Sequence, residues 1–557
     1  MFLFHCPGEP PVEFSFVEVN EAISAAIPDR EAVVFRDRRL TYAQLAERSR
    51  RLANVLLDHG IEVRAERSAL RGFESGQDHV ALYLYNGNEY LEGMLGAWKA
   101  RSAAFNVNYR YVEEELLYLF ENSRSRVVIY HSAFAPQIAS IRERLPQLEL
   151  LIQVADDSDI ALLPGAIDYE AALAAASSQL PDIGHSPDDL YILYTGGTTG
   201  MPKGVLWRSA DIFVAAMGGR KLDGTEFASL DAVVAQAAGG PGIKSLIGPP
   251  LMHGAAQWAT FINYAMGSTI VFGSQNEKLD PDDFLSTIER EKVNTATIVG
   301  DAFARPILDQ MERKKYDLSS LFLIGSGGAP LSTANKKEWL QKLPNITVID
   351  AIGSSETGAQ AMNPSNKDSG VTTGDFKPSP GACVVSEDLT RLLEPGDEEM
   401  GWFAQMGRVP LGYFGDAEKT EKTFPVIGGI RYSIPGDRAR HRADGQIDVL
   451  GRDSVTINSG GEKIFAEEVE HAIKLHPDVF DTVVAGRPSE RWGQEVVAIV
   501  ALREGKTPDE AALLAECGKH LARYKLPKLF VFRDEIQRSP SGKADYRWAQ
   551  QQARSGS

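Results

Sequence analysis

Residues 194–204 read Tyr-Thr-Gly-Gly-Thr-Thr-Gly-Met-Pro-Lys-Gly and follow an aromatic and aliphatic run, 190–193, that is typical of a buried strand. Four glycines and a proline make a helix or strand improbable across the stretch itself. Glycine lets successive backbone N–H groups point at one anion. Thr195, Thr198 and Thr199 add hydroxyl donors, and Lys203 adds a positive charge. The stretch is therefore a candidate polyphosphate cradle, although a flexible surface loop has a similar composition.

The length and charge of the chain limit its class. At 557 residues it is too long for one hydrophobic core and should divide into two or more domains. Acidic residues outnumber basic ones by 76 to 58, which gives a net charge of −18. Nucleic acids and anionic membranes attract basic surfaces, so neither is expected as the main partner.

Cysteine use and hydropathy point to a cytoplasmic protein. Cys6, Cys383 and Cys517 lie far apart and form neither a metal-ligand spacing nor a disulfide framework. The first residues lack the basic region of a signal peptide. No apolar run approaches the roughly 20 residues that a membrane-spanning helix needs. These features predict a soluble cytoplasmic protein that is not an integral membrane protein.

Strand and helix patterns alternate through the first three quarters of the chain. Thr41 and Gln44 form a capping-box pattern at the start of one helix. Mostly apolar strands between helices indicate an α/β fold with parallel or mixed sheets covered by helices on both faces. Further expected helices are 91–99 and 113–122, and expected strands are 31–35, 80–84, 127–130, 293–299, 321–324 and 347–352.

Three glycine-bearing polar loops follow strands, at 194–204, 325–331 and 353–358. In parallel sheets, ligands bind at such strand ends. From about residue 380 the pattern changes to short strands and turns. A new strand–helix pattern begins after Gly451, so we expect a large domain, 1–451, and a smaller α+β domain, 452–557.

These motifs, in this order, resemble those of the adenylate-forming superfamily of acyl-CoA synthetases, luciferases and peptide-synthetase adenylation domains. The resemblance runs from Thr41 to Lys543, which covers nearly the whole chain. Residues 194–204 match the phosphate signature of the family, with Gly196 where serine is commoner. Residues 194–208 and 457–470 are most similar to actinobacterial acyl-CoA synthetases that act on fatty acids or steroid side-chain carboxylates. The other matching segments are 327–331, 353–356, 432–437, 451–452 and 540–543.

The resemblance implies a two-step reaction. A carboxylate attacks the α-phosphate of ATP and expels pyrophosphate, and the thiol of coenzyme A then displaces AMP from the acyl-adenylate. Such transfers depend on positioning and on neutralisation of charge. ATP, Mg²⁺ and coenzyme A are the implied cofactors or co-substrates, and a carboxylic acid is the partner. The C-terminal domain is implied to be mobile, with a hinge near 452–454.

The resemblance also assigns roles to individual residues. The catalytic set is Lys543, Thr199, Glu356 and His253, and Glu356 also carries Mg²⁺, a cation that prefers oxygen ligands. Asp437 is assigned to the ribose hydroxyls. Glycines at 460 and 461 would let pantetheine pass close to the backbone. The full set of cofactor-binding residues is Thr195, Gly196, Gly197, Thr198, Gly200, Lys203, Gly327, Gly328, Ala329, Ser355, Asp437, Arg452, Gly460 and Gly461.

Structural roles compete with several of these assignments. Glu356 could start a helix after two serines, where a negative charge favours the helix dipole. Arg452 could make a surface ion pair, Asp437 could belong to a generic turn, and His253 could be a buried structural histidine. Trp258 and Phe303 could belong to the core as readily as to an acyl pocket, which Gly327 could also line.

The chain departs from the family pattern at a few positions. Ile352 stands where an aromatic residue usually stacks on adenine. Pro435 follows Ile434 where the family usually has threonine. Ser454 and Val455 replace a charged pair at the hinge, which leaves the pivot residue open. No departure removes a group that the chemistry requires.

Other functions remain open at this stage. A fatty acyl-AMP ligase would pass the acyl group to a separate carrier protein, since no carrier domain follows Lys543 in this sequence. The motifs also fit an oxygen-dependent luciferase, or a non-catalytic nucleotide-binding protein on the same fold. The sequence carries no signal for oligomeric state, and a homodimer is one expectation.

Overall fold

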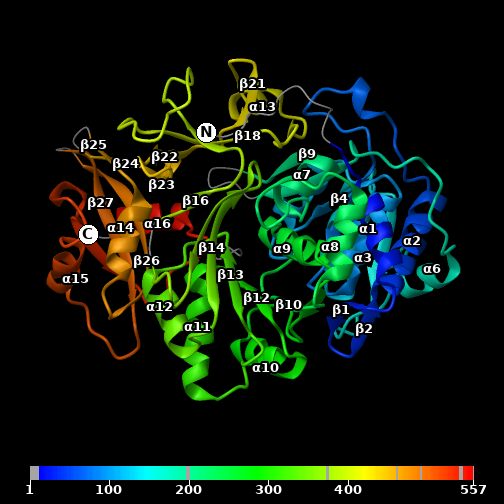
Figure 1. The fold of residues 1–557 in the computed structure, drawn as a ribbon, viewed down its shortest axis with the longest axis horizontal. Coiled ribbons are helices and arrows are strands. Elements are labelled where there is room, and N and C mark those ends of the chain that lie inside the picture. Colours follow the sequence, from blue (N-terminus) through cyan, green and yellow to red (C-terminus); the bar gives the residue numbers. More distant parts are fainter. Residues whose placement is uncertain are drawn as a thin grey trace.

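The structure is a computed structural model that describes residues 12–195, 201–371, 375–459, 462–489, 492–538 and 543–555. Figure 1 shows a large N-terminal part, coloured blue to yellow, and a smaller C-terminal part, coloured orange to red, that packs beside α11 (Gly300–Arg313) and α12 (Thr333–Lys342). The chain therefore has the α/β architecture with mixed sheets that its sequence predicts.

The largest sheet has nine strands, of which the six from β14 to β1 in spatial order run parallel. The strands at its edges pair antiparallel. In spatial order the strands are β16 (Lys377–Pro378), β15 (Gly358–Ser365), β14 (Thr347–Ser354), β13 (Leu323–Gly327), β12 (Thr295–Ile298), β10 (Lys244–Ile247), β11 (Thr269–Phe272), β1 (Glu31–Phe35) and β2 (Arg38–Thr41).

Helices cover both faces of this sheet. Apolar residues of α10 (Pro281–Glu291), α11 and α12 form one core with strand residues such as Leu246 and Val271. The opposite core includes Val33 and Ile270 and contains residues of α1 (Phe16–Ala26), α8 (Leu230–Gly239) and α9 (Gly254–Ala265). Burial on both faces explains the nearly continuous apolar strands.

A second sheet is wholly parallel. It is also covered on both faces, with α2 (Tyr42–Asp58) and α3 (Asn88–Lys99) contributing to one core and α4 (Glu113–Ser123) and α5 (Ala135–Ile141) to the other. The helix α6 (Tyr169–Ala175) follows its last strand. The strands in order are β4 (Ala103–Asn106), β3 (His79–Tyr83), β5 (Val127–His131), β6 (Leu150–Val154) and β7 (Ile167–Asp168).

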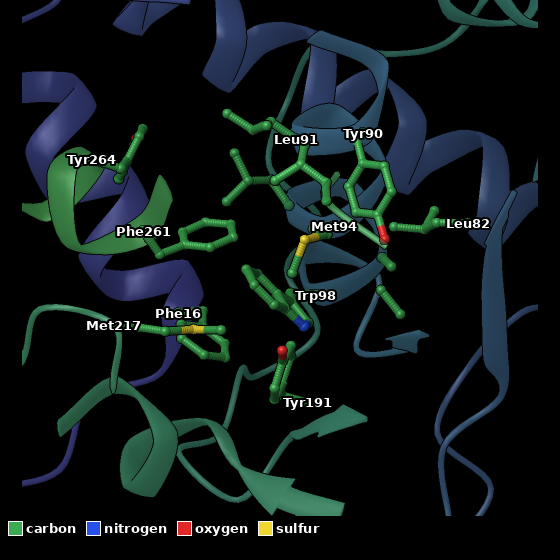
Figure 2. Close-up of a cluster of buried hydrophobic side chains, with 14 of the residues drawn as sticks. Phe16, Leu82, Tyr90, Leu91, Met94, Trp98, Tyr191, Met217, Phe261 and Tyr264 are labelled. Carbon is green, nitrogen blue, oxygen red and sulfur yellow. The ribbon is translucent and has the colours of Figure 1, made fainter. Parts of the chain in front are cut away.

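Aromatic packing joins the helices that surround these sheets. Phe16 of α1 stacks on Trp98 of α3 with ring centroids 4.0 Å apart, and Trp98 lies 5.2 Å from Phe261 of α9. Figure 2 shows this cluster with Met94 and Tyr191 beside it. Such pairs contribute about 0.5–1.5 kcal/mol each beyond the burial of their area, so three helices distant in sequence are fixed against one another.

Two smaller sheets complete the N-terminal part. One consists of β19 (Gly412–Tyr413), β9 (Lys203–Arg208) and β8 (Leu190–Thr195), and it leads into α7 (Ser209–Ala216). The helix α13 (Ala417–Thr423) follows β19. The other sheet contains β20 (Val426–Ile427), β21 (Ile430–Ser433), β18 (Gly401–Met406), β22 (Asp437–His441) and β23 (Ile447–Arg452), with β17 (Ala382–Val385) paired to β18.

The C-terminal part has its own sheet and core. Helices α14 (Ala466–Lys474) and α15 (Glu510–Cys517) belong to the core on one face, and α16 (Tyr546–Ser555) belongs to the core on the other. Both cores consist only of residues after 456. The strands are β25 (Glu462–Ile464), β24 (Ile457–Ser459), β27 (Gly493–Leu502), β26 (Val479–Ser489) and β28 (Leu529–Phe532).

Five short 3₁₀ turns occur in the described residues: Arg67–Ala69, Ser132–Phe134, Arg142–Arg144, Asp453–Val455 and Arg523–Lys525. The predicted capping box is present, because Gln44 N donates to Thr41 Oγ1 and Thr41 N donates to the Gln44 side chain. The predicted strands and helices all occur, with ends shifted by a few residues. Among the helices described, none combines the length and the apolar character needed to cross a membrane.

Candidate active site

The predicted phosphate cradle is the connection of a β-hairpin. Thr195, which ends β8, lies opposite Lys203, which begins β9. We expected Lys203 inside the loop, but the antiparallel ladder begins directly after Pro202, so Lys203 lies on a strand. Its place is therefore fixed by backbone pairing. The remaining predicted cradle residues, Gly196, Gly197, Thr198, Thr199 and Gly200, lie outside the described residues.

Lys203 lies in a cluster of polar groups that the sequence analysis missed. Its Nζ is 2.5 Å from Asp416 Oδ2 and 5.9 Å from the centroid of the Tyr413 ring. Lys419 Nζ lies 4.8 Å from the same centroid. Asp416 caps α13, because Lys419 N donates to Asp416 Oδ1 at 3.0 Å. Burial, with Lys203 adding to it, lowers the pKa of Lys419.

Glu356 lies in the tight turn between β14 and β15, so it does not start a helix. The strand β14 continues through Gly353 to Ser354, and this continuation rules out the helix-start interpretation. The Tyr413 hydroxyl donates to Glu356 Oε1 at 2.7 Å. A second contact holds this turn, because Trp207 Nε1 donates to Ser355 O at 2.9 Å. Glu356 is thus fixed beside the cluster that surrounds Lys203.

Asp437 and Arg452 face each other across neighbouring strands. They are direct partners in the β22–β23 ladder, and Arg452 Nε lies 3.2 Å from Asp437 Oδ1. Burial acts to lower the pKa of Arg452, but the charges of Asp437, Glu356 and Glu467 outweigh it and raise this pKa. The arginine therefore lies among three carboxyl groups and does not make an isolated surface ion pair.

Lys543 comes to the same place from the other end of the chain. Desolvation of its ammonium and the positive charge of Arg452 lower the pKa of Lys543, while Glu356 and Asp437 oppose the shift. Lys543 as a whole is nevertheless exposed to solvent. The charges that act on Lys543 thus come from Glu356, Asp437 and Arg452, three other predicted site residues that lie up to 187 positions away in the sequence.

The segment after Arg452 is anchored to the N-terminal part. Arg438 is almost fully buried, and its Nε lies 3.0 Å from Asp453 Oδ1. Asp453 N also donates to Gly436 O at 3.0 Å. The adjacent Gly451 has φ +120°, and a Cβ there would lie 2.5 Å from Glu467 Oε2 of α14. Glycine at 451 therefore allows the C-terminal part to approach this strand.

On the opposite side of the hairpin, one buried asparagine joins three segments. Asn106 at the end of β4 donates from Nδ2 to Tyr194 O at 2.8 Å and to Met252 O at 2.6 Å, and Tyr194 N donates to Asn106 Oδ1 at 2.8 Å. Met252 precedes His253, which is the N-cap of α9 and is half-buried. Asn106 therefore fixes the start of the cradle relative to the turn that carries His253.

The other predicted nucleotide and acyl residues have mixed outcomes. Gly327 is the last residue of β13, where it pairs with Ala351 of β14, and Gly328 and Ala329 follow it. Trp258 is 9% exposed and belongs to the core near Phe261, and Phe303 packs against the core around α11. Ile352 packs against a small core that includes Ala361. Gly460 and Gly461 lie outside the described residues.

Two features bear on further ligands. Within the described ranges there is no group of three or more histidine, cysteine or carboxylate residues placed to hold a metal ion. Mg²⁺ takes oxygen ligands, so phosphate oxygens could complete its coordination beside the Glu356 carboxylate. A cavity of about 370 Å³ lies where β10, β11 and β12 end and reaches the C-terminal part, with Arg110, Phe303, Arg305, Phe480 and Arg538 among its lining residues.

Comparisons with known proteins identify the family of this chain. The family model described as AMP-binding enzyme matches residues 21–401, and the model described as AMP-binding enzyme C-terminal domain matches residues 468–543. The medium-chain acyl-CoA ligase Mig of Mycobacterium avium is 57% identical over 544 residues, which cover 98% of this chain and 99% of that protein. A 3-oxocholest-4-en-26-oate–CoA ligase of Rhodococcus rhodochrous is 41% identical and covers 94% of this chain and 93% of its own.

Solved structures show the same fold. The anthranilate CoA ligase AuaEII in complex with anthranoyl-AMP aligns with a TM-score of 0.80 at 23% identity, over 96% of each chain. The fatty acyl CoA synthetase of Mycobacterium tuberculosis aligns with a TM-score of 0.68 at 25% identity, over 95% of this chain and 96% of its own. Together, the two family matches, the relatives and the shared fold confirm the resemblance: this chain belongs to the AMP-binding enzyme family.

Proposed function

We propose that this chain is an ATP-dependent acyl-CoA synthetase that converts a carboxylic acid to its CoA thioester through an acyl-adenylate. One observation carries the proposal: Lys543, from the C-terminal part, comes within electrostatic range of Glu356, Asp437 and Arg452. A cation opposite these groups can neutralise charge on an attacking carboxylate and on the α-phosphate. The named activities of the 57% and 41% identical relatives support the same reaction.

The first step would proceed by positioning. Thr195, Lys203 and the loop between them would hold the β- and γ-phosphates, and Asp437 would accept hydrogen bonds from the ribose hydroxyls. Glu356 would hold Mg²⁺, which supplies positive charge to the departing pyrophosphate. Lys543 would hold the acid carboxylate and the α-phosphate together. One carboxylate oxygen then bonds to the α-phosphorus as the bond to the pyrophosphate oxygen breaks.

In the second step the acyl group of the acyl-adenylate is transferred to coenzyme A. The coenzyme A thiolate attacks the acyl carbon, the carbon–oxygen bond to AMP breaks, and AMP leaves with both bonding electrons. We propose that residues 452–557 rotate as a domain between the steps, with 1–451 binding ATP and acid. The separate cores of the two parts support this division. Gly460 and Gly461 keep their predicted role beside pantetheine.

The acid is proposed to be a medium- or long-chain fatty acid or a steroid side-chain acid. The relative Mig is named for medium-chain acids, and the 41% identical relatives are named for 3-oxocholest-4-en-26-oate, some of them also for medium- and long-chain fatty acids. The proposal includes Mg²⁺ dependence, a cytoplasmic location and a homodimer as predictions.

Product analysis tests this function. The purified chain is incubated with ATP, Mg²⁺, coenzyme A and a panel of fatty and steroid acids, and AMP and thioester are measured by mass spectrometry. We expect AMP and thioester in equal amounts, each dependent on an acid. Pyrophosphate release that no acid stimulates would contradict the proposal. Transfer to a holo carrier protein but not to coenzyme A would favour the fatty acyl-AMP ligase, and ATP binding without turnover would favour a non-catalytic role.

A further inference from the structure

The boundary between the two parts of the chain contains a contact that has no assigned role. Arg305 of α11 is 4% exposed, and its Nη1 donates to the backbone oxygen of Val479 at 3.0 Å. Its guanidinium carbon lies 5.1 Å from the centroid of the Phe480 ring. Val479 and Phe480 begin β26. A side chain of the N-terminal part therefore contacts the first strand of the β26–β27 hairpin in the C-terminal part.

An ionic contact runs beside it. Asp301, one turn earlier on α11, accepts from Ser332 N at 2.8 Å and from Asn335 Nδ2 at 2.7 Å through Oδ1. Its other oxygen lies 3.6 Å from Lys474 Nζ, at the end of α14. The carboxylate is therefore oriented by its own part of the chain and presents its second oxygen to the other part.

These contacts lead to Lys543. Lys474 Nζ also lies 3.2 Å from Asp481 Oδ1, and both oxygens of Asp481 accept from Arg538 at 2.6 Å. Arg538 in turn forms an antiparallel bridge with Ala544, the residue after Lys543. A continuous set of contacts thus connects α11 to Ala544, the residue after Lys543.

We propose that Arg305 is a positioning residue that, by gripping Val479 and Phe480, holds the C-terminal domain in the orientation that presents Lys543 to the nucleotide site. This inference rests on the proposed role of Lys543 in adenylation. Arg305 touches no reacting atom in the adenylation step. It acts by raising the population of one domain orientation.

The contact of Arg305 with β26 is weak enough to break in each catalytic cycle. The Arg305 Nε has no hydrogen-bond partner among the described residues. Asp301, Asp481 and Asp309 act on the buried guanidinium, but burial outweighs them and lowers the pKa of Arg305, so much of the desolvation cost stays uncompensated. The net stabilisation is therefore small, and rotation of the domain would return the charge to water.

The test separates the two half-reactions. Acid-dependent exchange of labelled pyrophosphate into ATP reports adenylation, and single-turnover conversion of synthetic acyl-adenylate with coenzyme A reports thioester formation. For Arg305→Ala we expect adenylation to fall about tenfold, while thioester formation does not fall, because a two-state shift away from one orientation populates the other. Arg313→Ala, an exposed residue at the end of the same helix, is the matched control and should leave both rates unchanged.

A second variant covers the case in which Arg305→Ala folds poorly. Phe480 is 40% exposed, so Phe480→Ala removes the aromatic face with little loss of core packing. It should lower adenylation selectively, and the double variant should be no slower than Arg305→Ala alone, because both changes break one contact.

Other outcomes overturn the inference. Equal losses in both half-reactions, or no loss in either, would show that Arg305 does not select an orientation. A loss confined to the CoA step, with a raised KM for coenzyme A, would instead place Arg305 on the path of the acceptor, since it lines the cavity between the two parts. Absence of acid-dependent exchange in the wild-type protein would overturn the proposed function, and this inference with it.

Discussion

At the scale of single residues, the Lys543 ammonium is the positive charge that we propose for the adenylation step. Lys543→Ala should lower adenylation by about 10²–10³-fold, the usual effect of removing one preorganised group that stabilises developing charge. Conversion of preformed acyl-adenylate to thioester should change little. Pyrophosphate exchange and single-turnover thioester formation measure the two effects. Lys528→Ala, an exposed lysine of the same part, is the control, and equal losses in both steps would remove the proposed role.

Asp437 makes a separate prediction about the nucleotide. If its two oxygens accept from both ribose hydroxyls, Asp437→Asn should raise the KM for ATP about tenfold, because a hydrogen bond to a charged group contributes about 1.5–3 kcal/mol. With 2′-deoxy-ATP one of those bonds is already lost, so the same substitution should raise KM less. Steady-state kinetics with both nucleotides measure the difference, and Asp444→Asn in a nearby exposed turn is the control. An equal increase for both would mean that Asp437 does not contact the 2′-hydroxyl.

At the scale of elements, α14 places the carboxyl group of Glu467 in a buried position near other charged side chains. Burial, then the negative charges of Glu470 and Asp437, raise the pKa of Glu467 from 4.5 to about 8, and Arg452 opposes the shift. The folded protein thus holds a proton that the unfolded chain releases above about pH 4.5. The stability contributed by this proton is complete below that pH and is lost as the pH rises through about 8.

Glu467→Gln should therefore change the pH dependence of stability. The amide cannot ionise, so the variant should match the wild-type Tm near pH 5 and exceed it increasingly towards pH 8–9. Thermal unfolding followed by circular dichroism across this range measures the difference in Tm. Glu510→Gln, in the exposed first turn of α15, should show no such trend. A Tm difference that is constant with pH would contradict the assigned environment of Glu467.

The same elements show what the sequence could predict. Strands such as β3 and β5 were identifiable because burial on both faces makes them continuously apolar, and the helix after Thr41 was identifiable from its capping box. The antiparallel pairing of Lys203 was not predicted, because a strand followed by a glycine-rich loop reads the same in parallel and antiparallel sheets. The motifs of the family predicted site roles for Glu356 and Asp437.

Residues outside those motifs were missed. Tyr413, Asp416 and Lys419 became part of the site only through tertiary contacts, although an aromatic residue, a carboxylate and a lysine within seven positions were a visible signal. Asn106 is a single buried amide whose role depends on two partners far along the chain, Tyr194 and Met252. No local pattern indicates such a role.

At the scale of the whole molecule, a net charge of −18 repels a nucleotide that carries several negative charges. The partly exposed pair Lys203–Asp416 keeps the cradle cation neutralised. Asp416→Asn should preserve the cap of α13, since asparagine caps helices well, and should leave Lys203 uncompensated. ATP binding should then be tighter at low salt. It should also weaken more steeply with added KCl, because salt screens the attraction between exposed charges, with a screening length of about 10 Å at 0.1 M. Calorimetric titrations over a salt series measure this, and equal salt slopes for variant and wild type would contradict it.

The three hydrogen bonds of Asn106 have a thermodynamic consequence. They tie the strand that leads into the phosphate cradle to the turn that begins α9, so a ligand that shifts one segment does work on the other. Binding on the two sides is then linked, and linkage is reciprocal. Whatever factor ATP applies to the affinity for the acid, the acid must apply to the affinity for ATP, and the Asn106 amide is a direct route by which that shared factor can pass between the two segments.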